Sequence, residues 1–284
     1  MVNTNTPALA DKQDKAQSGQ LERAFAVIHA LTNSLFPMKL NALAEVAGLD
    51  PSGTLRLLKT LSELGYVMRD DARKAYFPSP RALFPLSMFH PLDELRRDAA
   101  EPLLRILRET TATSALQAFI CGQRVVVEHC AGSNRLSPYV DHTVNSLLHS
   151  SASGKVLLST MDGAERRALL GDGPFPQSTP HTLTTWAQLD ADIERGVERG
   201  FFTVVEEAML GMSAIAAPLK LPNGSVVGCL VAFGTTAQLP LTLMPERGLV
   251  VCQAADMLKS MSPALRALEP LLMRSPKLAA SALE

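Results

Sequence analysis

The sequence lacks the features that mark membrane, secreted and metal-binding proteins. No apolar run in its 284 residues approaches the roughly 20 residues that a bilayer-spanning helix needs, and the first twenty residues lack the apolar core of a secretion signal. The chain has only four cysteines and no CxxC pair, so neither a zinc knuckle nor a disulfide framework is indicated. We therefore expect a cytoplasmic protein with reduced thiols and with no metal, cofactor or membrane partner.

The chain also lacks an excess of acidic or basic residues. The formal net charge of −1 at pH 7 gives no indication of nucleic acid binding for the chain as a whole. Such a function would depend on a local basic surface. Hydrophobic residues make up 46% of the chain, which is enough to supply a core for each of two domains of ordinary size.

A phosphate-binding loop is also missing, although the segment HSSASGKVLLS at 149–159 contains a Gly-Lys pair. A P-loop requires another glycine five residues before Gly154 and a Ser or Thr after Lys155, because backbone N–H groups and a hydroxyl hold the phosphates and Mg²⁺. Those positions are occupied by His149 and Val156. Nucleotide chemistry is therefore disfavoured, and the segment needs another explanation.

The N-terminal part of the chain is predicted to be a disordered tail over 1–19 followed by a helical unit over 20–82. Apolar residues recur at helical spacing over 21–31 and again over 40–47. A third helix is expected after Asp50, which is a good N-cap and is followed by proline.

That third helix has two distinct faces. Thr54, Leu57, Leu58 and Leu61 would pack inward, and the opposite face presents short polar and basic side chains. A helix that follows a tight turn and carries such residues near its start has the geometry to enter the major groove of DNA. The predicted DNA-binding residues of this helix are Ser52, Gly53, Arg56, Lys59 and Thr60.

A hairpin completes the unit. The segment YVMRDDARKAYF at 66–77 alternates and turns at its Asp-Asp-Ala sequence, which predicts a wing with Arg69, Arg73 and Lys74 near its tip. This order is typical of a winged helix-turn-helix, whose partner is double-stranded DNA. A helical interaction module without DNA contacts stays an alternative, because residues 21–81 carry eight Lys or Arg against six Asp or Glu.

The remainder of the chain is predicted to form a connector, a second domain and a tail. Residues 83–111 are expected to be a linker that ends in one long helix. Residues 112–265 alternate strands with helices and contain an antiparallel hairpin, marked by Asn223-Gly224, which indicates an α+β domain. A tail follows over 266–284.

Three segments give the chain a resemblance to IclR-family transcriptional regulators. GLDPSGTLRLLKTLSELGYV at 48–67 is similar to the DNA-binding signature of the family. LLHSSASGKVLLS at 147–159 and GFFTVVEEAMLGMSAIAAPLKLPNGSVVGCLVAFG at 200–234 resemble its two most recognisable effector-domain segments. All three occur in the order and spacing of the family, and the resemblance covers residues 20–265.

The resemblance implies a winged helix-turn-helix joined by a linker helix to a GAF-like α/β effector-binding domain. It also implies a homodimer or homotetramer that binds a pseudo-palindromic operator, in most cases as a repressor controlled by a small molecule. By the same resemblance, Ala152, Ser153 and Gly154 lie at the mouth of the effector pocket, where a helix N-terminus suits a carboxylate. From the residues alone, Ser153 could equally be a plain helix cap.

Two positions of the third helix depart from the family pattern. Gly53 stands where Thr is frequent, and Leu55 stands where an aromatic residue or His is frequent. The set of base-contacting side chains is therefore reduced, and no operator sequence can be transferred from relatives.

The second strand pair is expected to line the effector pocket. A two-residue hairpin loop pairs Ala216 with Val231 and Ala214 with Phe233, so that all four share one face. By resemblance, family members that bind small hydrophilic acids carry hydroxyl side chains at the positions of Val231 and Phe233. Their absence here favours an effector with an apolar or aromatic body and one carboxylate. The alternative is that Phe233 fills the pocket and leaves it small or closed.

An enzyme is the rival hypothesis from another class. GMSAI at 211–215 lacks the second glycine of a nucleophile elbow, and no catalytic residue or triad can be assigned. Glu206 and Glu207 are adjacent on an expected strand and would point to opposite faces. Glu128, His129 and Cys130 are consecutive, and consecutive residues rarely converge on one metal ion. The alternative to an effector-controlled DNA-binding regulator is a small-molecule sensor or hydrolase-like enzyme without sequence-specific DNA binding.

Overall fold

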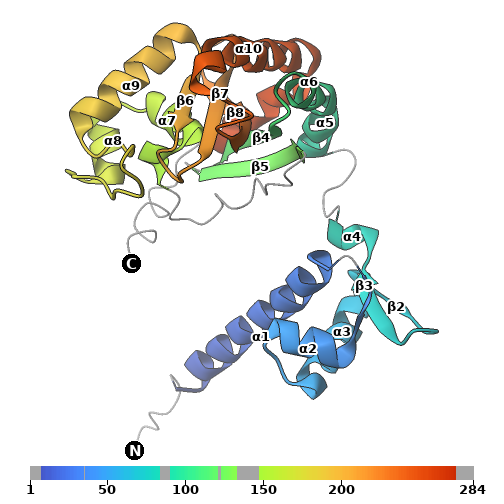
Figure 1. Cartoon of the computed structure of the whole chain (residues 1–284). Helices are drawn as coiled ribbons and strands as arrows, with labels where there is room; N and C mark the ends of the chain where they lie inside the picture. The colour runs from blue at the N-terminus through green and yellow to red at the C-terminus, as the bar shows by residue number, and fades with distance from the viewer. Residues whose placement is uncertain (1–7, 35, 84–89, 121–122, 133–146, 273–284) are drawn as a thin grey trace, which may run out of the picture. The chain divides into compact units, whose positions relative to one another are not determined.

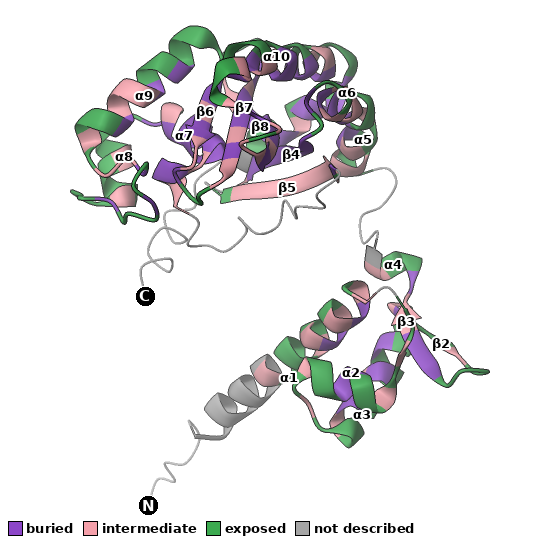
Figure 2. Ribbon diagram, in the orientation of Figure 1, coloured by how far each residue is buried: buried purple, intermediate pink, exposed green. Residues whose placement is uncertain are grey.

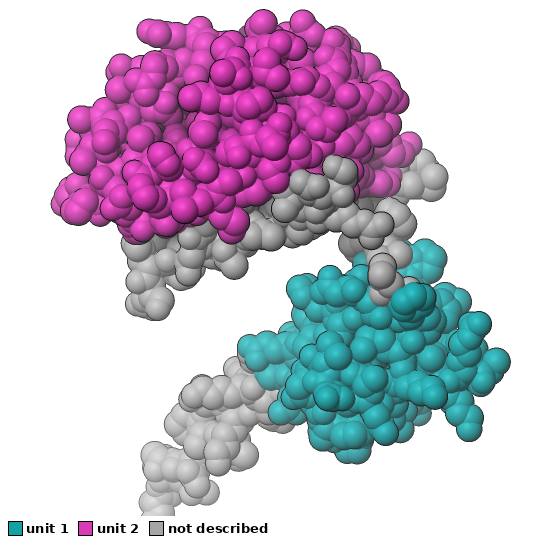
Figure 3. All heavy atoms as spheres, viewed as in Figure 1, with its two compact units in different colours: residues 1–87 teal, residues 88–284 magenta. Residues whose placement is uncertain are grey.

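The computed structural model describes residues 8–34, 36–83, 90–120, 123–132 and 147–272 of the chain. The chain divides into two compact units, Met1–Ser87 and Met88–Glu284, which are coloured separately in Figure 3. The division falls inside the predicted linker of 83–111, so most of that linker belongs to the second unit.

The first unit packs helices on a small sheet (Figure 1). Its helices are α1 (Ala8–Thr32), α2 (Leu40–Ala47), α3 (Pro51–Glu63) and α4 (Pro80–Leu83), and its strands are β1 (Met38–Lys39), β2 (Val67–Asp70) and β3 (Ala75–Pro78). The strands pair antiparallel in the order β1-β3-β2. Leu43 and Leu58 are fully buried between the helices. The predicted helix pair and wing are confirmed, and β1 adds a strand too short to leave a sequence pattern.

Helix α1 begins earlier than the sequence predicts. The structure starts it at Ala8, so the prediction of disorder over 1–19 is wrong for residues 8–19. Ala, Lys and Gln in this stretch are good helix formers and continue a helix without apolar periodicity. The periodicity that begins at Leu21 marks the part of α1 that packs on the unit, not the place where the helix starts.

The second unit is a five-stranded antiparallel sheet with helices on both faces (Figure 1). Its strands are β4 (Thr113–Ile120), β5 (Gln123–Cys130), β6 (Phe202–Val205), β7 (Met212–Lys220) and β8 (Val226–Thr235), in the order β5-β4-β8-β7-β6. Its helices are α5 (Pro91–Asp98), α6 (Ala100–Thr110), α7 (Ala152–Ser159), α8 (Gly163–Leu170), α9 (Trp186–Arg199) and α10 (Met244–Met261). Short 3-10 helices are η2 (Leu148–Ser150), η3 (Leu241–Leu243) and η4 (Pro263–Leu272).

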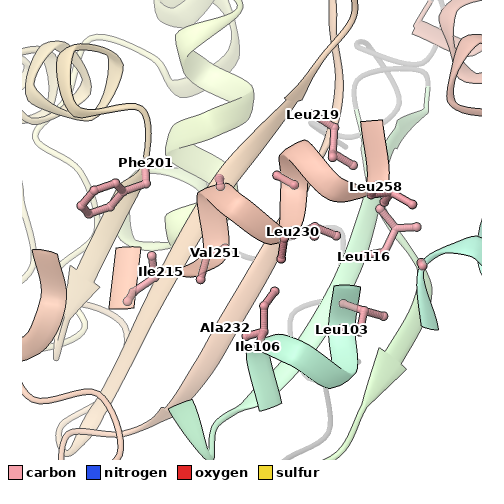
Figure 4. Packing of buried hydrophobic residues seen from close by; sticks show 14 of the residues in the cluster. Leu103, Ile106, Leu116, Phe201, Ile215, Leu219, Leu230, Ala232, Val251 and Leu258 are labelled. Atoms are coloured by element: carbon pink, nitrogen blue, oxygen red, sulfur yellow. The ribbon is translucent and has the colours of Figure 1, made fainter. Parts of the chain in front are cut away.

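The sheet separates two hydrophobic interiors. On one face Ile106 of α6 and Val251 of α10 pack against Leu116 and Leu230 of the sheet, as the close view in Figure 4 shows. On the other face α7 and α9 pack against strand residues such as Phe119. Figure 2 shows the central strands buried, whereas edge strand β5 is half-buried. The predicted effector residues belong to the interior under α7.

The predicted linker helix is two helices that form part of the core. Helices α5 and α6 meet at Ala99, which caps both of them and keeps right-handed helical angles of φ −71° and ψ −15°. Pro102 has no N–H to donate to the preceding turn, so one continuous helix would lose a hydrogen bond at this point. Leu95, Leu103 and Ile106 are fully buried in the second unit. These helices therefore stabilise the effector domain in addition to following the connector.

The C-terminal end of the second unit also extends further than predicted. Of the tail expected over 266–284, the residues up to Leu272 form η4, and Leu268 is fully buried in the same interior as α6 and α10. Residues 273–284 lie outside the described part of the chain.

The β7–β8 hairpin has the predicted register but a different loop. The predicted pairs, Ala216 with Val231 and Ala214 with Phe233, are both present. The loop has three residues, because the backbone N–H of Leu221 donates to the carbonyl of Ser225 at 2.8 Å and Gly224 takes a φ of 93°. An irregularity at Lys220 restores the predicted register in the strands.

Candidate functional site

Helix α3 starts at a side-chain cap that uses two of the predicted DNA-binding residues. The Asp50 carboxylate accepts hydrogen bonds from the Ser52 hydroxyl and the Gly53 backbone N–H, both at 2.7 Å. The bond from Ser52, followed by the bond from Gly53, lowers the pKa of Asp50. A Cβ at position 53 would lie 2.6 Å from Asp50 Oδ2, so glycine allows the carboxylate to close over the helix start.

The other predicted residues of α3 lie on its solvent face. Arg56, Lys59 and Thr60 are exposed, while Thr54 and Leu58 on the opposite side are fully buried. Lys59 Nζ lies 4.0 Å from Glu63 of the same helix. Among the described residues, the Arg56 guanidinium makes no hydrogen bond or ion pair. Arg56 is therefore available to an external anion.

In the wing, two aspartates pair with the two arginines. Asp70 accepts from the backbone N–H of Arg73 at 3.0 Å and from its guanidinium at 2.9 Å, and the backbone bond contributes most to the lowered pKa of Asp70. Arg69 Nε lies 3.4 Å from Asp71. Lys74 is exposed at a φ of 50°, and no ion pair of its side chain occurs in the described part of the chain. The two arginines are thus partly neutralised, and Lys74 is not.

The predicted effector residues lie together in the interior under α7. Ala214, Ala216, Val231 and Phe233 share the sheet face on which α7 packs, and Ala152 at the start of α7 belongs to the same cluster. Ala152 is 1% exposed and Val231 is 5% exposed. Phe233 and Ala214 are half-buried at the margin of the cluster. The face is apolar, as the sequence predicts.

Ser153 is not the cap of α7. Helix α7 begins after Ser151, whose side chain makes no cap hydrogen bond. The hydroxyls of Ser151 and Ser153 instead accept from the guanidinium of Arg124 in β5, at 2.7 and 2.9 Å. Nothing in the sequence pattern indicates Arg124, because the paired residues are 27 and 29 positions apart.

Gly154 allows a close approach between α7 and the turn before it. A Cβ at this position would fall on the carbonyl oxygen of Leu148 in η2. The glycine of the Gly-Lys pair is therefore required for the first turn of α7 to pack against η2.

Lys155, the second member of the pair, is a buried charge. Its Nζ donates to Asp192 Oδ2 and to Glu207 Oε1, both at 2.7 Å, and its side chain is 0% exposed. Burial raises the pKa of Glu207 even though Lys155 lies against it. Burial acts on Asp192 in the same direction, but Lys155 and the nearby Arg195 together outweigh it and lower the pKa of Asp192. This cluster joins α7, α9 and the segment after β6.

The acidic residues near this cluster do not form a catalytic pair. Glu207 binds Lys155, whereas Glu206 takes a φ of 56° and accepts from the backbone N–H of Gly211 at 2.7 Å. In the ranges that the structure describes, no group of three or more His, Cys, Asp or Glu is placed to hold a metal ion. No helix in those ranges has the length and apolar character to cross a membrane.

Comparison with known proteins relates both units to one family. The model described as "Bacterial transcriptional regulator IclR C-terminal" matches residues 92–243, and "IclR helix-turn-helix domain" matches residues 20–71. The HTH-type transcriptional regulator BhcR of Paracoccus denitrificans is 27% identical over 248 residues, which cover 86% of this chain and 87% of that protein. The HTH-type transcriptional repressor AllR of Escherichia coli is 26% identical over 261 residues, with 88% and 92% covered.

Solved structures share the fold. IclR of Thermotoga maritima matches with a TM-score of 0.66 at 23% identity, covering 86% of this chain and 98% of that one. An IclR homologue from Microbacterium hydrocarbonoxydans, crystallised with 4-hydroxybenzoate, matches with a TM-score of 0.65 at 18% identity, covering 87% of this chain and 99% of that one. The N-terminal helix-turn-helix unit and the C-terminal mixed helix and sheet unit are therefore both of the predicted kind.

Proposed function

The chain belongs to the IclR family of transcriptional regulators, and from that premise we propose which of its surfaces binds DNA and what kind of effector controls it. It is a DNA-binding regulator under effector control, not an enzyme. The proposal rests on the different surfaces of the two units. The first unit exposes basic side chains that lack an ion-pair partner among the described residues, and the second unit buries an apolar face.

The DNA interface consists of the solvent face of α3 and the wing. Arg56 reads a base edge or fixes α3 against phosphate, because it is exposed and its guanidinium makes no hydrogen bond or ion pair within the described residues, although its charge helps to lower the pKa of Asp50. Lys59 and Thr60 extend the same face by one turn, and Ser52 and Gly53 set the start of the helix through Asp50. Arg69, Arg73 and Lys74 of the wing contact phosphates, which requires no particular base sequence.

The protein acts as a repressor in the cytoplasm and binds a pseudo-palindromic operator as a homodimer or homotetramer. Leu21 and Phe25 lie one turn apart on α1 and are 63% and 62% exposed, which supports a second copy covering this face. Phe25→Glu should then lower the mass measured by light scattering and weaken operator binding. An unchanged mass would remove this face from the interface.

The effector is an organic acid with an apolar or aromatic body. Val231 and Phe233 offer no hydroxyl to a small polar acid, whose oxygens would lose water without gaining partners. An aromatic ring would gain from burial against the same side chains, with its carboxylate at the start of α7. The solved relative with 4-hydroxybenzoate shows that a protein of this fold can take up an acid of that size.

The proposal is tested on the full chain in two steps. Duplexes that the chain retains from a random pool define its operator, and failure to select any duplex would favour a sensor without DNA binding. Thermal shifts are then measured with benzoate and 4-hydroxybenzoate, and with glyoxylate and pyruvate. We expect the aromatic acids to raise Tm and Phe233→Ser to begin responding to the small acids. Stabilisation by the small acids alone would refute an aromatic effector, and a response only after Phe233→Ala would show that Phe233 fills the site.

A further inference from the structure

Arg124 brings a positive charge to the start of α7. It lies opposite Phe119 in the β4–β5 pair, and its guanidinium reaches the hydroxyls of Ser151 and Ser153. A helix N-terminus already carries a partial positive charge and repels a cation. Because no side chain caps α7 and Arg124 lies beside its first turn, an anion at this point would be stabilised by both.

Gln117 is a second polar group on the same face, and it is not satisfied. The residue is 4% exposed, and its Oε1 is buried without a hydrogen-bond partner among the described residues. It lies two positions before Phe119 on β4, so its side chain points to the interior under α7. A buried carbonyl oxygen without a donor is unfavourable, which indicates that a bound group supplies the donor.

The two polar groups are close to one another across neighbouring strands. Gln117 lies opposite Val126, and Arg124 is two residues before Val126 on β5, which makes Gln117 and Arg124 diagonal neighbours on one face. On its other side Gln117 lies opposite Cys229 of β8. Burial raises the pKa of the Cys229 thiol to about 12 although the charge of Arg124 acts in the opposite direction. The thiol therefore stays neutral, and it does not compete with an anion for Arg124.

We propose that Arg124 and Gln117 select the effector by reading two different groups on it. Arg124, with the first turn of α7, holds a carboxylate, and Gln117 Oε1 accepts a hydrogen bond from a hydroxyl of the same molecule. The surrounding apolar side chains, Phe119 and Val231 among them, cover the ring. The inference rests on the proposed function, since it takes this face to be the effector site, and it narrows the effector to a hydroxylated aromatic carboxylic acid.

The test is calorimetric binding of benzoate, the three hydroxybenzoates, phenol and inorganic phosphate to the full chain. At least one hydroxybenzoate should bind about tenfold more tightly than benzoate, and phenol and phosphate should bind weakly. Gln117→Leu should abolish the preference for the hydroxyl while raising the Tm of the ligand-free protein, because it removes an unsatisfied buried group. Arg124→Met should weaken benzoate and hydroxybenzoate alike by about tenfold or more, and Arg124→Lys should weaken both by less.

Matched controls lie on the other face of the sheet. Arg105 of α6 donates a hydrogen bond to Gln253 of α10, so Arg105→Met and Gln253→Leu make the same chemical changes away from the site. Both should bind every acid as the wild type does. The inference would be overturned if Gln117→Leu kept the preference for the hydroxyl, or if Arg124→Met and Arg124→Lys bound the acids with wild-type affinity. Either result would leave the proposal of an aromatic effector unaffected. A wild type that binds only glyoxylate or pyruvate would overturn both.

Discussion

The two candidate sites hold their charges in opposite ways. On α3 of the first unit, Arg56 and Lys59 extend into solvent, where a charge costs little and can meet any polyanion. Under α7 of the second unit, Lys155 is fully buried and is held by two carboxylates from other elements. A buried charge must be paired, so substituting either partner leaves an unpaired buried charge and destabilises the fold. The difference predicts that mutations in the first unit alter binding, whereas mutations in the second alter stability and selectivity.

The largest effect is expected from Lys155→Met. The substitution leaves Glu207 buried without its cation and leaves Asp192 with only the exposed Arg195, 3.0 Å away, which should lower the free energy of unfolding by about 3–5 kcal/mol. Without Lys155, nothing opposes the burial that raises the pKa of the Glu207 carboxyl in the folded state. The folded protein then binds more protons than the unfolded one, so the stability lost at pH 7 should be regained as pH falls toward the ordinary Glu value of 4.5. Urea unfolding at several pH values measures this.

The control for that variant is Lys259→Met. Lys259 pairs with Asp256 on α10, and the aspartate side chain is 70% exposed, so this pair should contribute only about 0–1 kcal/mol. If Lys155→Met and Lys259→Met lowered the free energy of unfolding equally, the proposed difference between buried and exposed charges would be wrong.

The next effect in size concerns Arg56. Arg56→Ala should cost about 1–3 kcal/mol in binding to the selected operator, because the side chain meets DNA, and should leave thermal stability unchanged. Arg108→Ala is the matched loss of an exposed arginine in the second unit, where Arg108 pairs with Glu101. If gel-shift affinities of the two variants are the same, Arg56 is not part of the interface.

The smallest effect distinguishes the basic residues of the wing. Lys74→Gln should weaken binding to all duplexes alike and reduce the slope of log affinity against log salt by about 1. Arg73→Gln should change the slope by less, because Arg73 is already paired with Asp70 in the free protein. Larger loss for Arg73, or a change in sequence preference for either variant, would show that the wing contacts bases or rearranges on DNA.

The sequence predicts the parts of the molecule that depend on neighbouring residues. The two faces of α3 follow from helical spacing, and the cap at Asp50 needs only the next three residues. The pairing of Ala216 with Val231 is also correct, although the loop is longer by one residue, because the irregularity at Lys220 compensates.

The sequence does not predict contacts between distant segments. Lys155 meets Asp192 and Glu207, which are 37 and 52 positions away, and no periodicity or motif connects them. Arg124 and its two serines are separated in the same way. From the sequence, the Gly-Lys pair serves only to exclude a phosphate-binding loop. Its role in packing depends on Leu148 and on the distant carboxylates of Asp192 and Glu207.

The central claim is that one chain carries two separable sites, and a single gel-shift series tests it most directly. Wild type, Arg56→Ala and Arg124→Met are each titrated onto the selected operator, with and without the hydroxybenzoate that binds best. We predict that the acid releases the wild type, that Arg124→Met binds the operator normally but is not released, and that Arg56→Ala binds the operator poorly while its Tm still rises with the acid. Loss of operator binding by Arg124→Met, or loss of the acid response by Arg56→Ala, would contradict the separation of the two sites.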